Sequence, residues 1–232
     1  MSVFAAALAA FVALHVGISA TGLRRGIVAR LGEGRYRIVF ALASAGLLYT
    51  MIAGFGALRA DPFDPLNQAL WTPPEWLRWP GAALVTFGVT LAVAGVLTPG
   101  PTYAGFEKAS LARAEPARGV LRITRHPFLW GVALWAVAHL LVNGERFAPI
   151  LFGALGAMAL LGARSIDRKG AARDPEAWAR FAAATSNIPF AAIVEGRNRL
   201  ALGEIGWRLL AAVAALGLMV VLHERFTGFA AY

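Results

Sequence analysis

The sequence predicts an all-α fold, a polytopic membrane helical bundle with about six transmembrane helices. Three features support this: an apolar composition, long uncharged runs and alternating loop charge. Hydrophobic residues make up 58% of the 232 residues, charged residues only 15%, and the mean hydropathy is +0.61. A soluble domain carries about a quarter of its residues as charged side chains. No repeat or second domain is evident, so we expect residues 1–232 to form a single transmembrane domain.

Six apolar runs are candidates for membrane spans. Crossing a hydrocarbon core of about 30 Å takes about 20 apolar residues. The candidates are Val3–Gly22, Tyr36–Leu58, Pro80–Leu97, Pro127–Val142, Ala148–Arg164 and Ile205–Leu222. The fourth and fifth are short and rich in Gly and Ala. The lipid bilayer is therefore the first partner that we expect for this chain.

The loops between these runs alternate in charge. The first loop carries five arginines against Glu33 alone, and the third and fifth loops are also basic, whereas the second and fourth are not. The positive-inside rule places the basic loops in the cytoplasm and both termini outside, in a bacterial inner (cytoplasmic) membrane. The same rule accounts for the net charge of +9. No groove-reading or aromatic motif indicates nucleic-acid binding.

The fifth loop contains a further predicted helix. Asp174 suits an N-cap and Pro175 suits the first helical turn. Trp178 and Phe181 are three residues apart and share one helix face. This spacing predicts an amphipathic helix that lies on the cytoplasmic membrane interface.

All four histidines fall inside or at the ends of the predicted spans. Ionisable side chains at membrane depth are costly and usually face the bundle interior, a cofactor or a water-filled path. His15 is mid-span, so it either bonds a neighbouring helix or ligates a metal or haem. His139 shares a helix face with Trp135 and Asn143, a setting that suits a flat apolar cofactor. His223 is most simply an interfacial residue.

His126 lies between Arg125 and Pro127 at the predicted start of the fourth span. These side chains either anchor the helix start or bind lipid or propionate carboxylates, or an anionic cosubstrate. His126 and His139 are about 20 Å apart along one helix, so they cannot share an iron. A two-histidine site therefore pairs His15 with His139. His15 is about a turn shallower, a difference that helix tilt could close.

Other chemistries lack their residues. The chain has no cysteine, which excludes disulfides and thiolate catalysis. It has no glycine-rich phosphate loop and no His-Glu-x-x-His motif. The predicted spans also lack carboxylates, so no proton relay of a transporter is evident.

The segment RHPFLWGVALWAVAHLLVNG, from Arg125 to Gly144, resembles the NnrU family. This family is named from gene clusters for nitrite and nitric oxide reduction, and it includes relatives of the plant zeta-carotene isomerase, a haem b enzyme. The sequence around His15 and the segment from Trp178 to Phe190 are also similar to family blocks. The resemblance implies haem b, with its iron held by His15 and His139. It also implies cis-trans isomerisation of a carotenoid such as 9,15,9'-tri-cis-zeta-carotene, a hydrophobic polyene.

Two alternatives remain open at this point. The isomerase has a cysteine three residues before its second histidine, where this chain has Ala136, so a thiolate exchange is not available here. A non-catalytic haem or redox protein that supports denitrification, with an unidentified redox partner, is one alternative. The other is a membrane methyltransferase, which the Arg-His-Pro start also resembles. Arg125 and His126 would then bind S-adenosylmethionine, with Asp167, Asp174 and Glu176 as loose matches to the acidic residues of such enzymes.

Overall fold

The structure is a computed structural model that describes residues 2–19 and 21–227. Within these residues the regular elements are helices, and the one β-type pairing is an isolated bridge between Ala69 and Glu145. The long elements are α1 (Val3–Val12) with its π-helical continuation η1 (Ala13–Ser19), α3 (Glu33–Ala60), α4 (Arg78–Val96), α6 (Pro127–Val142), α7 (Ala154–Arg173) and α11 (Trp207–Thr227).

Short helices connect these long elements. They are α2 (Leu23–Leu31), η2 (Pro65–Asn67), η3 (Glu75–Leu77), α5 (Glu107–Leu111), η4 (Gly119–Arg122), η5 (Pro149–Gly153), α8 (Pro175–Ala183), α9 (Ala191–Val194) and α10 (Leu202–Ile205). The segments η1 and η5 are π-helical, a geometry that occurs mostly as single turns within α-helices and frequently at functional sites.

Each of the six predicted runs lies over a helix, but the count of six spans is approximate. Among the described residues, four helices are long and apolar enough to cross a membrane: Glu33–Ala60, Glu75–Val96, Pro149–Arg173 and Trp207–Arg225. The first helix counts as a fifth span when it is taken together with α2, which is inclined to it by 84°. The remaining run, α6, has 16 residues and is about 24 Å long, shorter than a hydrocarbon core of about 30 Å.

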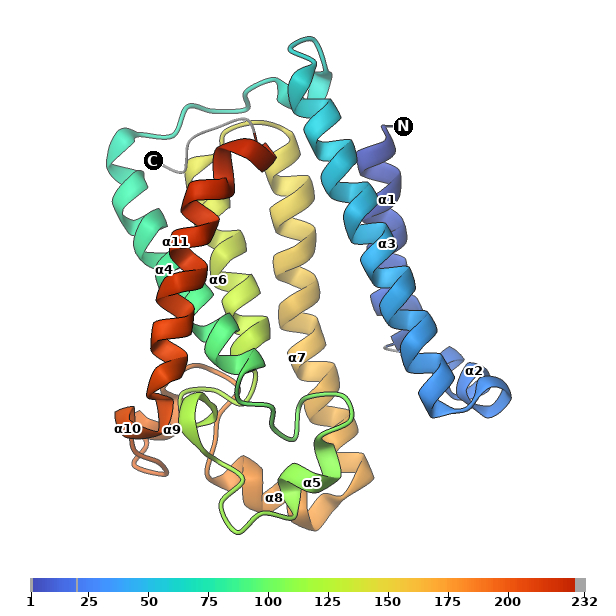
Figure 1. Ribbon diagram of the computed structural model, residues 1–232, viewed down its shortest axis with the longest axis vertical. Coiled ribbons are helices and arrows are strands. Elements are labelled where there is room, and N and C mark those ends of the chain that lie inside the picture. The colour runs from blue at the N-terminus through green and yellow to red at the C-terminus, as the bar shows by residue number, and fades with distance from the viewer. Residues whose placement is uncertain (1, 20, 228–232) are drawn as a thin grey trace.

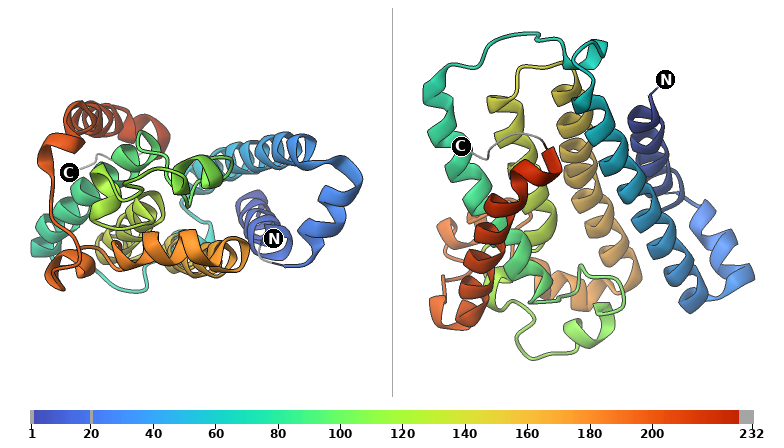
Figure 2. Two further views of the ribbon diagram at one scale, coloured as in Figure 1. Left: turned by 90° about the horizontal axis from the view of Figure 1, so that it is seen from below. Right: turned by 45° about the horizontal axis from the view of Figure 1, so that its top comes forward.

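The long helices form two groups. Helices α1 and α3 pack as a hairpin beside a group formed by α4, α6, α7 and α11 (Figures 1 and 2). Helix α1 begins and α11 ends at one end of the bundle, and α2, α5 and α8–α10 lie at the other (Figure 1). The basic loops therefore share one end, as the loop charges predict. Which membrane face this end occupies stays a prediction.

Helices α4 and α6 pack closely because glycines meet at their interface. A Cβ atom on Gly88 would lie 2.8 Å from the carbonyl oxygen of Gly131, and one on Gly131 would lie 2.5 Å from that of Gly88. Gly81 and Gly95, seven residues to either side, have equally close neighbours in Val142 and Pro127 of α6. Small residues at such interfaces let helix backbones approach within a membrane. This contact holds the start and end of α6 against α4.

The fifth-loop helix begins where the sequence predicts, but its apolar face packs against protein. The Asp174 side chain caps α8 by accepting a hydrogen bond from the backbone N–H of Ala177 (3.1 Å). Trp178 covers Gly170 of α7, and Phe181 is fully buried in a cluster with Leu111 of α5. The expectation that this face lies on the membrane interface is therefore wrong. The face instead attaches α8 to α5 and α7.

Candidate functional site

His139, in the last turn of α6, has an imidazole whose orientation is fixed by the helix backbone. Its Nδ1 lies 2.8 Å from the backbone carbonyl oxygen of Trp135. Because a carbonyl can only accept, Nδ1 carries the hydrogen and Nε2 keeps its lone pair. Metal-ligating histidines usually have this arrangement, in which a carbonyl fixes the tautomer and the ring orientation. The rings of Trp135 and Phe152 flank the imidazole, each with its centre 4.7 Å from that of His139.

A second imidazole lies near His139. The ring of His223, near the end of α11, has its centre 6.5 Å from that of His139, and the two planes are inclined by 31°. Both side chains are half-buried. In the part of the chain that the structure describes, His223 is the histidine whose ring pairs with that of His139. The sequence pattern alone had suggested only an interfacial role for this residue.

His15 has similar local chemistry in a different place. Its Nδ1 lies 2.8 Å from the backbone carbonyl oxygen of Phe11, which again leaves Nε2 with a lone pair. The ring contacts those of Phe11 and Phe40, with centres 4.2 and 5.1 Å away. His15 belongs to the π-helical segment η1, which continues α1. The half-buried imidazole thus packs against α1 and the first half of α3.

Among the described residues, no ring contact joins His15 to His139, and the two rings have different neighbours. Phe40, which contacts His15, and Phe55, 15 residues later on α3, are about 22 Å apart along the helix axis. From Phe55 a series of ring contacts leads across to His139: Phe55–Phe147 (5.1 Å), Phe147–Phe152 (6.3 Å) and Phe152–His139 (4.7 Å). These contacts connect His139 to Phe55 in the second half of α3, whereas His15 contacts Phe40 in the first half of that helix. The pairing of His15 and His139 on one iron stays a prediction.

The predicted site residue Asn143 and the neighbouring Ala136 have local structural roles. The side-chain amide of Asn143 donates to the carbonyl oxygen of His139 (2.8 Å), so it caps the last turn of α6. Ala136 is 1% exposed and packs against Gly156 of α7, where a Cβ would lie 3.1 Å from the Ala136 methyl group. Asn143 thus holds the segment that carries His139, and Ala136 turns its methyl group toward α7.

Arg125 and His126 belong to a separate polar network at the other end of α6. The Nε2 atom of the buried His126 lies 2.6 Å from Oδ1 of Asp167 on α7, and Nε of Arg125 lies 3.4 Å from Oδ2. Asn187 donates its side-chain amide to the same Oδ2 (3.3 Å) and accepts a hydrogen bond from the indole of Trp130 (3.0 Å). These two predicted anion-binding residues therefore face a carboxylate of the chain itself. Propionate, lipid or S-adenosylmethionine binding there stays a prediction.

The sequence pattern did not identify Asp167 and Asn187 as the centre of this network. A single carboxylate near the cytoplasmic end of a predicted span is the signal that points to Asp167, because such a group needs a partner at that depth. Burial is the main reason that the pKa of the Arg125 guanidinium lies below its ordinary value. The nearby Asp167 acts to raise this pKa, and Arg197 acts to lower it. An arginine stays protonated in proteins, so the pair remains ionic.

A second carboxylate joins the third loop to the start of α11. Glu204 of α10 accepts two hydrogen bonds from Arg122 (2.7 and 3.0 Å) and one from the backbone N–H of Gly119 (2.6 Å). The hydrogen bonds from Arg122 are the main reason that the pKa of Glu204 lies below its ordinary value. This bidentate pair ties the loop before α6 to the segment before α11, at the end of the bundle that carries the basic loops.

The fold and the site together define a polytopic helical membrane protein with imidazoles held among aromatic rings. The sequence profile of the NnrU protein family matches residues 3–231, which is nearly the whole chain. The protein therefore belongs to the NnrU family.

Two plant proteins are similar to this chain. The chloroplastic 15-cis-zeta-carotene isomerase of Zea mays is 32% identical over 190 residues, which cover 82% of this chain and 50% of that protein. The protein of the same name from Arabidopsis thaliana is 32% identical over 173 residues, covering 73% of this chain and 45% of its own. The chain thus spans about half the length of the curated relatives that it matches. No solved structure matches it.

Proposed function

We propose that this protein binds haem b and catalyses the cis-trans isomerisation of a carotenoid of the zeta-carotene type. The likeness to two proteins named 15-cis-zeta-carotene isomerase supports the reaction class. The observation that carries the haem part is the imidazole of His139, whose Nδ1 is held by the Trp135 carbonyl and whose Nε2 is free to ligate. We therefore expect an integral membrane haem protein that acts on a substrate dissolved in lipid.

The residues present fit a haem better than a bare metal ion. In the described part of the chain, no group of three His, Cys, Asp or Glu side chains is arranged to hold a metal ion. A haem brings four nitrogen ligands of its own, so one or two imidazoles suffice. His139 would hold the haem iron, and the rings of Trp135 and Phe152 beside it would supply apolar contacts. Arg125 and His126 are about 20 Å from His139 along α6, which leaves them to the network with Asp167.

Isomerisation moves no atoms between molecules and requires no net oxidation. When bound, reduced haem would supply electron density to the polyene and so weaken a central cis double bond. The protein's own side chains perform the remaining tasks. Trp135, Phe152 and Phe147 form an aromatic cluster at His139, in which Phe147 and Phe152 are buried, and this cluster would exclude water from the ligand. The Trp135 carbonyl keeps the His139 ring in one orientation.

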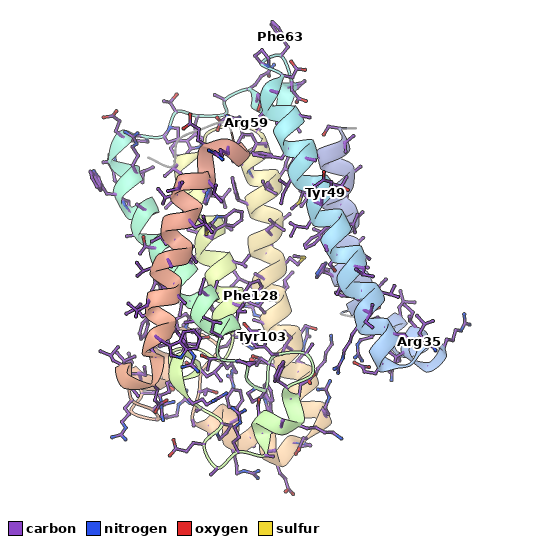
Figure 3. All side chains as sticks on the ribbon, in the orientation of Figure 1. Arg35, Tyr49, Arg59, Phe63, Tyr103 and Phe128 are labelled. Carbon is purple, nitrogen blue, oxygen red and sulfur yellow. The ribbon has the colours of Figure 1, made fainter. Side chains whose placement is uncertain are left out.

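The outer surfaces of the bundle suit a substrate that arrives through the bilayer. Large apolar side chains are exposed along α3 and α11, including Leu42, Tyr49, Leu210 and Val221. Figure 3 shows the side chains that project from these two helices, with Tyr49 labelled on α3. Because this surface is apolar, a carotenoid would reach the site from the lipid without crossing water.

The test is an isomerisation assay on the detergent-purified full chain, oxidised and dithionite-reduced, with poly-cis zeta-carotene as substrate. We expect a Soret band, sharp α and β bands on reduction, and conversion by the reduced protein only. The His139→Ala variant should lose both haem and conversion, whereas Tyr49→Phe on the exposed face of α3 should keep them. A wild-type protein that stays colourless after haem supplementation would contradict the proposal.

A non-catalytic redox role is the second candidate, and the closeness of the two imidazoles of His139 and His223 favours it. If both imidazoles held the iron, no position would stay open for a substrate, and this would suit electron transfer better than isomerisation. A haem-loaded protein that cycles between oxidation states but leaves poly-cis zeta-carotene unchanged would support this candidate over the isomerase.

A further inference from the structure

We propose that an arginine-rich cleft between the third and fifth loops binds a phosphate group, carried either by an anionic lipid headgroup or by a soluble molecule. The cleft has a volume of about 320 Å³ and lies at the end of the bundle that holds α8, α9 and α10 (Figure 1). None of its lining residues belongs to the histidine site, so this inference goes beyond the proposed function. Its basic lining consists of Arg113, Arg122, Arg180, Arg197 and Arg199.

Two of these arginines are held in place by partners within the protein. The side chain of Arg122 is 11% exposed and donates to Glu204 (2.7 and 3.0 Å) and to the side-chain oxygen of Asn198 (2.9 Å). Arg197 donates to backbone carbonyl oxygens at the end of α8, including that of Ala183 (2.7 Å). Carbonyl oxygens repel an anion, and the Arg197 guanidinium shields these ones. Both guanidinium groups are therefore positioned before any ligand binds.

The other three arginines lack such partners. Arg113, Arg180 and Arg199 are exposed, and their guanidinium groups form no ion pair or hydrogen bond with another described residue. They come from three segments: the loop after α5, helix α8, and the stretch between α9 and α10. Like charges that line one cleft repel one another, and an anion between them removes this cost. Guanidinium groups also suit phosphate, because each presents several N–H donors to its oxygens.

The charge of the cleft matches that of a phosphate monoester. Three carboxylates lie at its arginines: Glu115 and Glu204 pair with Arg122, and Glu195 pairs with Arg197. Five arginines against three glutamates leave a surplus of two positive charges. A phosphate monoester carries about −1.5 to −2 charges at pH 7, so one such group would neutralise the cleft.

Exposed apolar side chains lie on either side of the fifth-loop arginines in the sequence. Val194 and Leu202 flank Arg199 and are 84% and 68% exposed. Trp207, which is 58% exposed, begins the apolar helix α11 shortly afterwards. A basic cleft beside exposed apolar side chains, at the start of a membrane span, is typical of a site for an anionic lipid headgroup. A lipid is therefore the source of the phosphate that we expect.

The test removes two of the exposed charges from the full chain, in the double variant Arg180→Gln/Arg199→Gln. Native mass spectrometry of the detergent-purified protein measures the binding of phosphatidic acid and of neutral phosphatidylcholine. Calorimetry measures the binding of inorganic phosphate as the soluble probe. We expect the wild type to prefer phosphatidic acid and the double variant to bind it about 25-fold more weakly, because each basic residue near an anionic lipid contributes roughly a fivefold factor.

The matched control is Arg30→Gln/Arg35→Gln, which removes the same charge from exposed arginines of the first loop that form no ion pair with another described residue. This control should bind phosphatidic acid as the wild type does. Binding of inorganic phosphate that only the cleft variant loses, without a preference for phosphatidic acid, would assign the cleft to a soluble ligand. Equal losses in both double variants, no loss in the cleft variant, or no binding of either phosphate probe would overturn this inference and leave the proposed function standing.

Discussion

At the scale of single residues, Asp167 shows how one carboxylate organises the end of the bundle that carries the basic loops. It lies on α7 and contacts His126 and Arg125, which precede α6, and Asn187, which follows α8. The two carboxylate oxygens of Asp167 thus connect α7 to the segment before α6 and to the segment after α8. The His126 ring is buried, so the loss of its acceptor would leave a polar group without a partner away from water.

We expect Asp167→Asn to lower the free energy of unfolding by about 2 kcal/mol, because hydrogen bonds to a charged group are each worth roughly 1.5–3 kcal/mol. Reversible denaturation in mixed detergent micelles measures this. Glu176→Gln is the matched control, since Glu176 is exposed on α8 and forms no ion pair with another described residue. A variant as stable as the wild type would show that Asp167 does not hold these segments together.

At the scale of helices, the contact between α4 and α6 depends on a lack of side chains. Gly88 and Gly131 present their backbones to each other, so any added carbon meets a carbonyl oxygen rather than a flexible side chain. Because α6 carries His126 at its start and His139 at its end, displacing this helix disturbs both sites.

We expect Gly131→Leu to prevent the approach of α4 and α6 and to cost at least 1–3 kcal/mol, the usual range for overpacking. The yield of monodisperse protein on size-exclusion chromatography and the thermal midpoint in detergent report the effect. Gly46→Leu on α3 is the matched control, because no atom lies within 4 Å of a Cβ placed there. Equal losses in both variants would argue against a specific role for the glycine contact.

At the scale of the whole molecule, the ends of the bundle differ in charge and define an orientation. The end with α5 and α8–α10 carries most of the arginines, and the opposite end carries the loop in which Ala69 pairs with Glu145 (Figure 1). Phe63 lies at the tip of that opposite end and is 89% exposed (Figure 3). Because the chain has no cysteine, single introduced thiols can report which side faces out.

We expect a membrane-impermeant maleimide to label Phe63→Cys in intact cells and to label Lys108→Cys only after the membrane is opened. Lys108 is exposed on α5 at the basic end, so both positions are accessible to the reagent from their own side. The cysteine-free wild type is the control. The reverse pattern would contradict the orientation that the loop charges predict.

The sequence by itself determined the helical elements and their approximate ends. The six apolar runs coincide with helices because hydrocarbon admits only backbones whose hydrogen bonds are satisfied internally, and this requirement acts locally along the chain. The start of α8 at Pro175 was equally predictable from its capping residues. The family, too, could be identified from motifs, because the segment around His139 is contiguous.

The tertiary structure alone decided which side chains meet. The proximity of His139 to His223 rather than to His15, the role of Asp167 and the burial of Trp178 all depend on contacts between distant helices. Such contacts follow from crossing angles, relative depth and the fit of side chains at each interface, none of which residue spacing within one helix records. Spacing predicts which face of a helix carries a ligand, and packing selects the helix that faces it.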